Sequence, residues 1–536
     1  MTTIDTHVGA EAKASSSSFI GAVGQWVTSS DHKKIGRLFI GWSLIHAIEV
    51  AVLAAIFGFE RMSPKGLEII AGDSALQLSW YARHLMVLGL LAPLFLGLAI
   101  AIVPLQVGAR AIALPRLAQF SLWSWLFGSG LVLVSIIGNG GPGGGNGDMV
   151  DLFLMGAGLV AVGLIAGSVA VATTVMTARA PGMTMDFVPP FSWAALVGSV
   201  TTILSLPVAI GTLIYLYVDH TAGQVAFGSN KDIEKWLGWV YGQPQTFIFI
   251  VMALGVLAEI APVAARVRQP LRPVLLVGLG LAGSGVFGAV TQSSHVLNLD
   301  GSSSDKLSST LPFLLFNGLP LLGVLVSVAV ALLALKEGKP RVSASFAFAV
   351  LGSLMILAGV AGSFVQHIES ANLINTSFGE GVTAYLVFGG VLCALGGLTH
   401  WAPKLWGVVL DDKKVLGLAG LGLIGTVLSA LPLYIAGFAK QPAYALFGFD
   451  YDGPVALWNL LAGVGAAIVA LVVIAFVGLL LQAVKAGANA SDDPWDAQTL
   501  EWSVSSPAPT DNFAALATVN SSEPLLDAKP SQGVTA

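Results

Sequence analysis

Residues 78–107 read LSWYARHLMVLGLLAPLFLGLAIAIVPLQV, and this run gives the strongest indication of the fold. From Leu85 to Val103 it contains no charged side chain and none that forms hydrogen bonds. A run of roughly 20 apolar residues is long enough to cross the hydrocarbon core of a bilayer as an α-helix. Because no water is available there, the backbone must satisfy its own hydrogen bonds, and a helix does so within one segment. The run therefore predicts a membrane-spanning helix.

Eleven further segments have a similar length and apolar character. With the first run, the twelve predicted spans are 36–59, 78–107, 120–138, 151–177, 190–218, 243–265, 272–292, 310–335, 343–368, 379–402, 414–439 and 453–484. Only 10% of the 536 residues are charged, against about 25% in soluble proteins. So few charges cannot cover a surface that faces water. We therefore expect an all-α polytopic membrane protein with a lipid bilayer as its main surroundings.

The basic residues predict the orientation, because lysine and arginine gather on the cytoplasmic side of membrane proteins. The span ends on the same side of the membrane as the N-terminus hold sixteen basic residues, namely Lys33, Lys34, Arg37, Arg110, Arg116, Arg179, Arg266, Arg268, Arg272, Lys336, Lys339, Arg341, Lys404, Lys413, Lys414 and Lys485. The span ends on the opposite side hold six, namely Arg61, Lys65, Lys231, Lys235, Lys306 and Lys440. Both termini are therefore predicted to be cytoplasmic. We expect a disordered cytoplasmic N-terminus at 1–30, a twelve-helix transmembrane domain at 31–485 and a cytoplasmic C-terminal tail at 486–536.

The remaining composition excludes some classes of function. The net charge of −5 gives no indication of nucleic-acid binding. The single cysteine, Cys393, lies in an apolar run and excludes a disulfide framework or a cysteine-based metal site.

Several local strings resemble subunit I of the haem–copper oxidases, of the cytochrome c oxidase type. They occur in the family's order over about residues 28–513, with the predicted spans between them. The strings are SDHKKIG at 30–36, VPLQVGA at 103–109, LPRL at 114–117, RAPGMTM at 179–185, LSLP at 204–207, HWAPK at 400–404, and DPW at 493–495 with short matches that follow it up to Phe513.

The resemblance implies a particular fold and set of cofactors. Twelve helices would form three pseudo-symmetric arcs around pores that hold two haems and one copper, within a multi-subunit complex of a respiratory membrane. Six histidines on the second, sixth, seventh and tenth helices would bind the metals, because neutral imidazole suits both iron and copper. The resemblance also suggests the plasma membrane of a bacterium.

The sixth predicted span lacks the ligand that the resemblance implies. The family has Gly-His-Pro-Glu-Val-Tyr, and this chain has GQPQTF at residues 242–247. Gln243 stands at the copper-ligand position, Gln245 at the proton-handling glutamate and Phe247 at the tyrosine. An amide is a poor ligand for copper, and neither glutamine nor phenylalanine exchanges protons near pH 7.

The seventh and tenth predicted spans have also lost their ligands. The adjacent pair of copper histidines corresponds to Gln292 and Ser293. The two histidines that bind haem iron correspond to Gly381 and Thr383, and residues 375–399 contain no histidine. We therefore expect no copper site in this chain.

The second predicted span leaves one alternative open. The low-spin haem ligand corresponds to Ala82, and His84 lies two residues on, about 200° around a helix. A local slip in the match would make His84 a haem ligand, although its partner on the tenth span would still be absent. The paired arginines that hold haem propionates correspond to Ala443 and Tyr444. We expect no bound cofactor, with His84 as the one candidate ligand for a retained haem.

His46, Glu49, Arg83 and His84 form a candidate intramembrane polar site, because ionisable groups within a membrane are costly and often functional. His46 and Glu49 are three residues apart and share a helix face. With His84 they could form a small metal or proton site, or they could pair with each other or face an internal cavity. Arg83 could instead extend to the membrane interface.

Three functions remain open. The first is a redox-inactive, subunit-I-like component of a respiratory oxidase assembly, with a structural or assembly role alongside other oxidase subunits. The second is an active oxidase subunit that transfers electrons from cytochrome c to oxygen and translocates protons. The third is a channel, transporter or lipid-binding protein that reuses the vacant pores.

Overall fold

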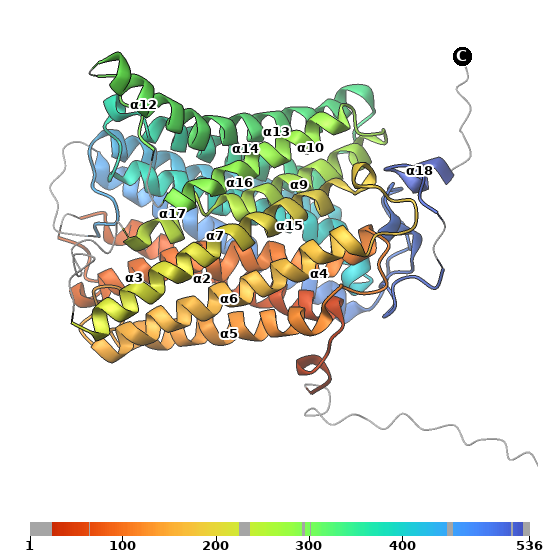
Figure 1. The fold of residues 1–536 in the computed structure, drawn as a ribbon, viewed down its shortest axis with the longest axis horizontal. Helices are drawn as coiled ribbons and strands as arrows, with labels where there is room; N and C mark the ends of the chain where they lie inside the picture. Colours follow the sequence, from red (N-terminus) through yellow and green to blue (C-terminus); the bar gives the residue numbers. More distant parts are fainter. Residues whose placement is uncertain are drawn as a thin grey trace, which may run out of the picture.

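The computed structural model describes residues 24–63, 65–223, 236–291, 295–300, 302–446, 454–515 and 518–528. Within these residues the regular elements are helices, and the long ones run side by side along the long axis of the molecule (Figure 1). Eleven are long and apolar enough to cross a membrane. The prediction of an all-α polytopic membrane protein is therefore confirmed.

The helices follow the predicted spans closely. The long elements are α2 (His32–Glu60), α3 (Gly72–His84) continuing through η1 (Leu85–Leu91) into α4 (Ala92–Gln106), α5 (Pro115–Ile137), α6 (Gly147–Thr177), α7 (Pro190–Thr221), α9 (Phe247–Ala265), α12 (Ser303–Phe313) continuing through η6 (Leu314–Gly318) into α13 (Leu319–Glu337), α14 (Ala344–Gln366), α15 (Ser377–Trp406), α16 (Asp412–Phe438) and α17 (Val455–Ala486).

The predicted span at 272–292 differs from the others. Its regular helix, α10 (Arg272–Gly283), has 12 residues and is about 18 Å long, whereas the hydrocarbon core is about 30 Å thick. The chain then continues as a 3₁₀ turn, η5 (Ser284–Phe287), and a short helix, α11 (Gly288–Thr291). Glycine is a poor helix former, and this segment has three within six residues. The described part of the chain thus holds eleven regular spans and this shorter, broken one rather than twelve equal ones.

Two of the long spans contain a π-helical segment, η1 and η6. In each case a proline follows two residues after the segment ends, Pro93 after Leu91 and Pro320 after Gly318. Proline has no N–H to donate to the preceding turn, and π-helical turns absorb such irregularities.

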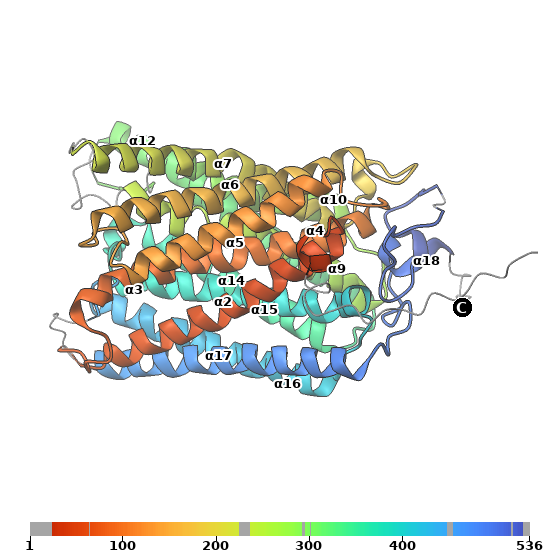
Figure 2. The same ribbon diagram turned by 90° about the horizontal axis from the view of Figure 1, so that it is seen from below.

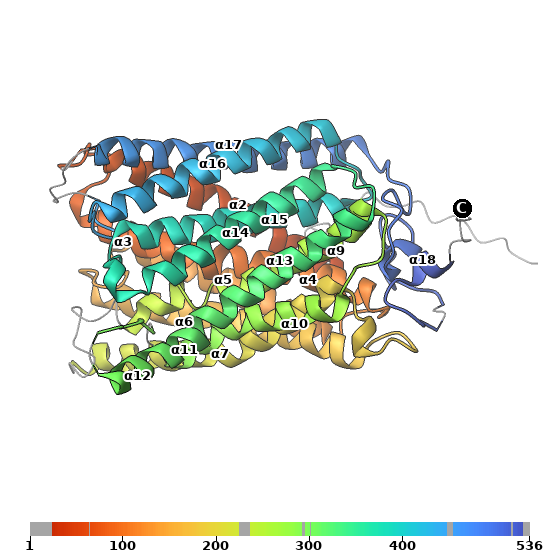
Figure 3. The ribbon, with the colours of Figure 1, turned by 90° about the horizontal axis from the view of Figure 1, so that it is seen from above.

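Three spans form the centre of the bundle. The α3–α4 span is 94% buried over its most apolar window, α9 is 100% buried and α15 is 89% buried. The helices α16 and α17 lie at one edge of the bundle, and α7 and α12 lie at the opposite edge (Figures 2 and 3). The α3–α4 and α15 spans carry Ala82, Gly381 and Thr383, three of the six positions at which the resemblance places metal ligands.

One end of the bundle, called the tail end below, is closed by residues 487–515 and 518–528, including the short helix α18 (Pro524–Ala528) (Figure 1). The Lys33 ammonium, at the start of α2, donates to the Asn512 Oδ1 atom at 2.9 Å and to the Thr510 carbonyl oxygen at 3.1 Å. Glu501 accepts from the Gln106 amide at 3.0 Å. The described part of the predicted tail is therefore packed against the helix ends.

Candidate functional site

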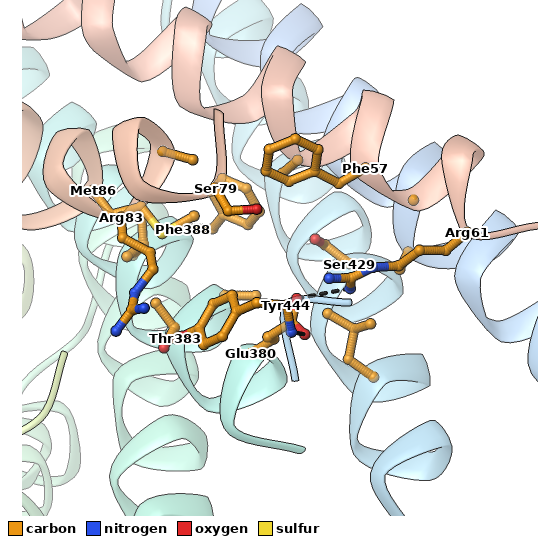
Figure 4. Close-up of a pocket in the computed structure, with 17 residues that line it drawn as sticks. Phe57, Arg61, Ser79, Arg83, Met86, Glu380, Thr383, Phe388, Ser429 and Tyr444 are labelled. Atoms are coloured by element: carbon orange, nitrogen blue, oxygen red, sulfur yellow. Dashed lines mark hydrogen bonds and ion pairs between the residues drawn. The ribbon is translucent and has the colours of Figure 1, made fainter. Parts of the chain in front are cut away.

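A cavity of about 70 Å³ lies near the opposite end of the bundle, between α2, α3, α15, α16 and α17 (Figure 4). Ala82 on α3 and Thr383 on α15 both line it. These are two of the positions that the resemblance assigns to haem ligands. The fold therefore brings them to one space, although they are far apart in sequence.

Charged and aromatic side chains frame this cavity. The Arg61 Nη1 atom lies 2.7 Å from the Glu380 Oε2 atom, and the other carboxylate oxygen of Glu380 accepts from the Tyr444 backbone N–H at 2.7 Å. The Arg83 guanidinium lies 4.4 Å from the Trp80 ring centroid and 4.5 Å from that of Tyr444. Figure 4 shows Arg83, Tyr444 and Glu380 in this arrangement. Cation–π contacts of this kind stabilise a desolvated guanidinium.

Arg83 is only 7% exposed. Two aromatic rings hold its guanidinium inside the protein, and the interpretation that Arg83 extends to the membrane interface stays a prediction. Tyr444 stands where the resemblance expects an arginine for a haem propionate, and its ring contacts Arg83 instead.

The residues at this cavity do not fit a haem. The Ala82 methyl group offers no lone pair to iron, and the Thr383 hydroxyl donates to the Gly379 carbonyl oxygen at 3.0 Å. A Cβ atom at Gly381 would lie 2.6 Å from the Tyr434 ring and 2.8 Å from the Ala430 carbonyl oxygen. The third expected haem-ligand position is therefore closed by α16.

Gln243 lines a second cavity, of about 460 Å³, at the same end of the bundle. The two cavities share Arg83, Glu380, Thr383 and Tyr444 as their common wall. Next to Gln243, the Gln245 amide donates to the Ser205 hydroxyl at 3.1 Å, and the Phe247 ring packs where Gly285 has no side chain. Gln245 and Phe247 therefore make contacts typical of side chains packed in the protein interior.

Gln292 and Ser293, the predicted positions of the copper histidine pair, lie outside the described residues. Within the described ranges, no three histidine, cysteine, aspartate or glutamate side chains gather where they could hold a metal ion.

One pair within the predicted polar site is in direct contact. The His46 Nδ1 atom lies 2.7 Å from the Glu49 Oε2 atom, and Tyr81 lies near the Glu49 carboxylate. His84 is fully buried, and within the described residues neither of its ring nitrogens has a hydrogen-bond partner. Its ring packs edge-on against Tyr241, at 5.4 Å between centroids, rather than lining the cavity of Ala82.

Sequence reasoning missed Tyr81, Glu380 and Tyr444 as members of these groups. Tyr81 lies within a predicted span, three residues before His84, so the two share a helix face. This spacing could have indicated that Tyr81 lies near the polar residues. Glu380 begins α15, and its partner Arg61 is 319 residues away in sequence. No local pattern signals such a pair.

Comparison with known proteins shows the family of the chain. Residues 34–468 match the family described as "Cytochrome C and Quinol oxidase polypeptide I". The chain is 31% identical to the "Putative cytochrome c oxidase subunit 1-beta" of Streptomyces avermitilis, over 94% of this chain and 91% of the relative. It is 29% identical to the "Probable cytochrome c oxidase subunit 1-alpha" of Streptomyces coelicolor, over 94% and 89%. It is 26% identical to the "Cytochrome c oxidase subunit 1" of Bacillus subtilis, over 93% and 82%.

These relatives are bacterial and are matched over nearly their whole length. With eleven helices that could span a membrane, the chain is a multi-pass protein of a bacterial membrane. The match over residues 34–468 shows that it belongs to the family of cytochrome c and quinol oxidase subunit I.

Proposed function

We propose that this chain is a redox-inactive, subunit-I-like component of a respiratory oxidase assembly, with a structural or assembly role. The observation that carries the proposal is the cavity shared by Ala82 and Thr383. An alanine and a threonine line it where the resemblance places histidine ligands, and Arg83 and Tyr444 contact each other in its wall.

The donor chemistry supports the absence of both haem and copper. Iron and copper in such sites need imidazole or comparable ligands. Alanine and glycine offer no side-chain ligand at residues 82 and 381, threonine offers a hydroxyl at residue 383, and glutamine offers an amide at residue 243. A haem held by His84 would need that ring to turn out of its packing against Tyr241 and Phe153.

The proposed partners are lipid and other subunits of a respiratory oxidase. Many large apolar side chains are exposed on the long helices, among them Phe127, Tyr215, Leu471 and Leu481, as expected of a lipid-facing surface. The names of the relatives refer to subunits of an oxidase, which motivates the search for partner subunits. The excess of lysine and arginine at the tail end supports a cytoplasmic location of that end in the plasma membrane.

Purification of the full-length protein under mild detergent from its own host tests both parts of the proposal. The visible absorption spectrum reports haem, and elemental analysis reports copper and iron. Mass spectrometry of the eluate reports partner subunits. Recovery of oxidase subunits with a haem-free chain is the expected result. A chain that elutes without them would contradict the assembly role, and a strong Soret band that belongs to the chain itself would contradict redox inactivity.

A further inference from the structure

A third cavity, of about 370 Å³, lies at the tail end, away from the positions discussed above. It is bounded by the end of α9, the start of α14, the last turns of α15 and the start of α16. Its lining combines apolar and charged groups, including Ile260, Val263, Arg266, Arg341, His400 and Trp495.

Two arginines of this cavity have no internal partner. Within the described residues, the guanidinium groups of Arg266 and Arg341 make no hydrogen bond or ion pair. The neighbouring arginines differ. Arg268 pairs with Glu523 and Asp527, and Arg272 donates to the carbonyl oxygens of Asp186 and Val188. Both arginines are exposed, so the two charges in the cavity are accessible to a ligand from the water.

A backbone hydrogen bond brings Arg341 close to the end of α9. The Arg341 N–H donates to the Ala264 carbonyl oxygen at 2.9 Å, two residues before Arg266. Arg266 ends α9 in the left-handed conformation, with φ of 58°, so the chain turns sharply at this residue. Both arginines line the same cavity because the loop before α14 is bonded to the end of α9.

The remaining polar groups of the cavity leave it with an excess of positive charge. Asp412 is the one acidic residue in the lining, and its Oδ1 atom accepts from the Ala344 N–H at 2.8 Å, at the N-terminus of α14. The N-terminal end of a helix favours negative charge. His400 is 2% exposed, and its Nε2 atom has no partner within the described residues. The Trp495 ring stacks on His400 with the centroids 6.1 Å apart.

We propose that this cavity binds a phosphate group, held by Arg266 and Arg341. Guanidinium groups bind phosphate oxygens in a bidentate manner. The phosphate can belong to the headgroup of an anionic phospholipid, because the cavity lies where spans end. It can equally belong to a soluble phosphate compound that enters from the water. Ile260, Val263 and Trp495 provide apolar contacts for the remainder of either molecule.

The test uses the full-length protein in a zwitterionic detergent, with inorganic pyrophosphate titrated at constant ionic strength and followed by calorimetry. If the phosphate belongs to a soluble compound, R266Q and R341Q should each weaken pyrophosphate binding about tenfold, since each removes one charge-assisted interaction with the anion. D412N should tighten binding because it removes the one negative charge and keeps the oxygen that accepts from Ala344. R116Q is the matched control, because Arg116 is exposed at the same end of the bundle and does not line the cavity.

A second arm identifies the source of the phosphate. The protein is purified with added phosphatidylglycerol, and native mass spectrometry counts the retained lipid molecules. A lipid headgroup predicts that R266Q and R341Q lose a lipid that R116Q keeps, and that pyrophosphate does not bind. A soluble ligand predicts pyrophosphate binding that phosphatidylglycerol leaves unchanged. If R266Q and R341Q match R116Q in both arms while their melting temperatures equal that of the unaltered protein, the proposal is overturned.

Discussion

The Nη1 atom of Arg61, at the end of α2, lies 2.7 Å from the Oε2 atom of Glu380, in the first turn of α15. The side chains are 3% and 13% exposed, so the pair is buried. It joins two spans that are distant in sequence, and it borders the cavity that Ala82 and Thr383 share. This ion pair thus connects α2 to α15 beside the positions where the resemblance places haem ligands.

Breaking this pair should destabilise the protein. E380A removes the Glu380 carboxylate from the buried Arg61 charge, and removal of one member of a buried pair costs about 3 kcal/mol. The measurement is the midpoint of thermal unfolding in detergent. E337A is the control, since Glu337 is exposed in the last turn of α13. Equal midpoints for the two variants would show that the pair does not hold the spans together.

The closure at Gly381 gives a second prediction. G381A introduces a Cβ atom 2.8 Å from a backbone oxygen of α16, which cannot move aside cheaply, and overpacking of this kind costs about 1–3 kcal/mol. G417A is matched to it, because Gly417 lies on α16 with no atom within 4 Å of the added Cβ. A lower thermal midpoint is expected for G381A and an unchanged or higher one for G417A. If both variants are as stable as the unaltered chain, α16 does not close the expected ligand position.

The attachment of the tail gives a third prediction. Asn512 is 1% exposed, accepts from the Lys33 ammonium and donates to the Ala109 carbonyl oxygen at 2.8 Å. N512A therefore leaves a buried cation with one partner fewer, at a cost of about 1–3 kcal/mol. Limited proteolysis should cleave the tail faster in N512A. The exposed Asn520 supplies the control variant N520A, and identical cleavage rates would contradict the role of Asn512.

The pH dependence follows from Glu501, which lies in the tail outside the spans. Burial raises the pKa of its carboxyl group above the usual value, so folding favours the protonated form. The unfolded chain releases this proton near pH 4.3, and from there up to the folded pKa the stability of the native state falls as the pH rises. E501Q keeps an oxygen for the Gln106 and Trp401 donors and removes the titration.

The stability of E501Q relative to the unaltered protein should therefore increase as the pH rises through this window. Urea unfolding of the two proteins at a series of pH values measures the difference. E337Q is the exposed control. Parallel stability curves for E501Q and the unaltered protein would contradict a raised pKa at Glu501.

The fold could be predicted because membrane spans are a property of local composition. Runs such as 78–107 are apolar enough to define a helix without knowledge of their neighbours. The exception was 272–292, where glycines at 283, 285 and 288 end the regular helix although the segment is apolar throughout. Hydropathy measures transfer into lipid and does not measure helix regularity.

The candidate site could be predicted only in part. Spacing from matched strings placed Ala82 and Thr383, and both line one cavity. The partners of charged residues could not be predicted, because Arg61 pairs with Glu380 of a distant span and Arg83 contacts the Tyr444 ring. Such pairs depend on which spans are neighbours, and a single sequence does not encode this in any local pattern.

The central claim is that this subunit-I-like chain binds neither haem nor copper. The most direct measurement is the iron and copper content per polypeptide of the full-length protein, separated from any partner subunits and read together with its visible spectrum. The account predicts far less than one metal atom per chain and no Soret band. One haem iron or one copper ion bound per chain would contradict it.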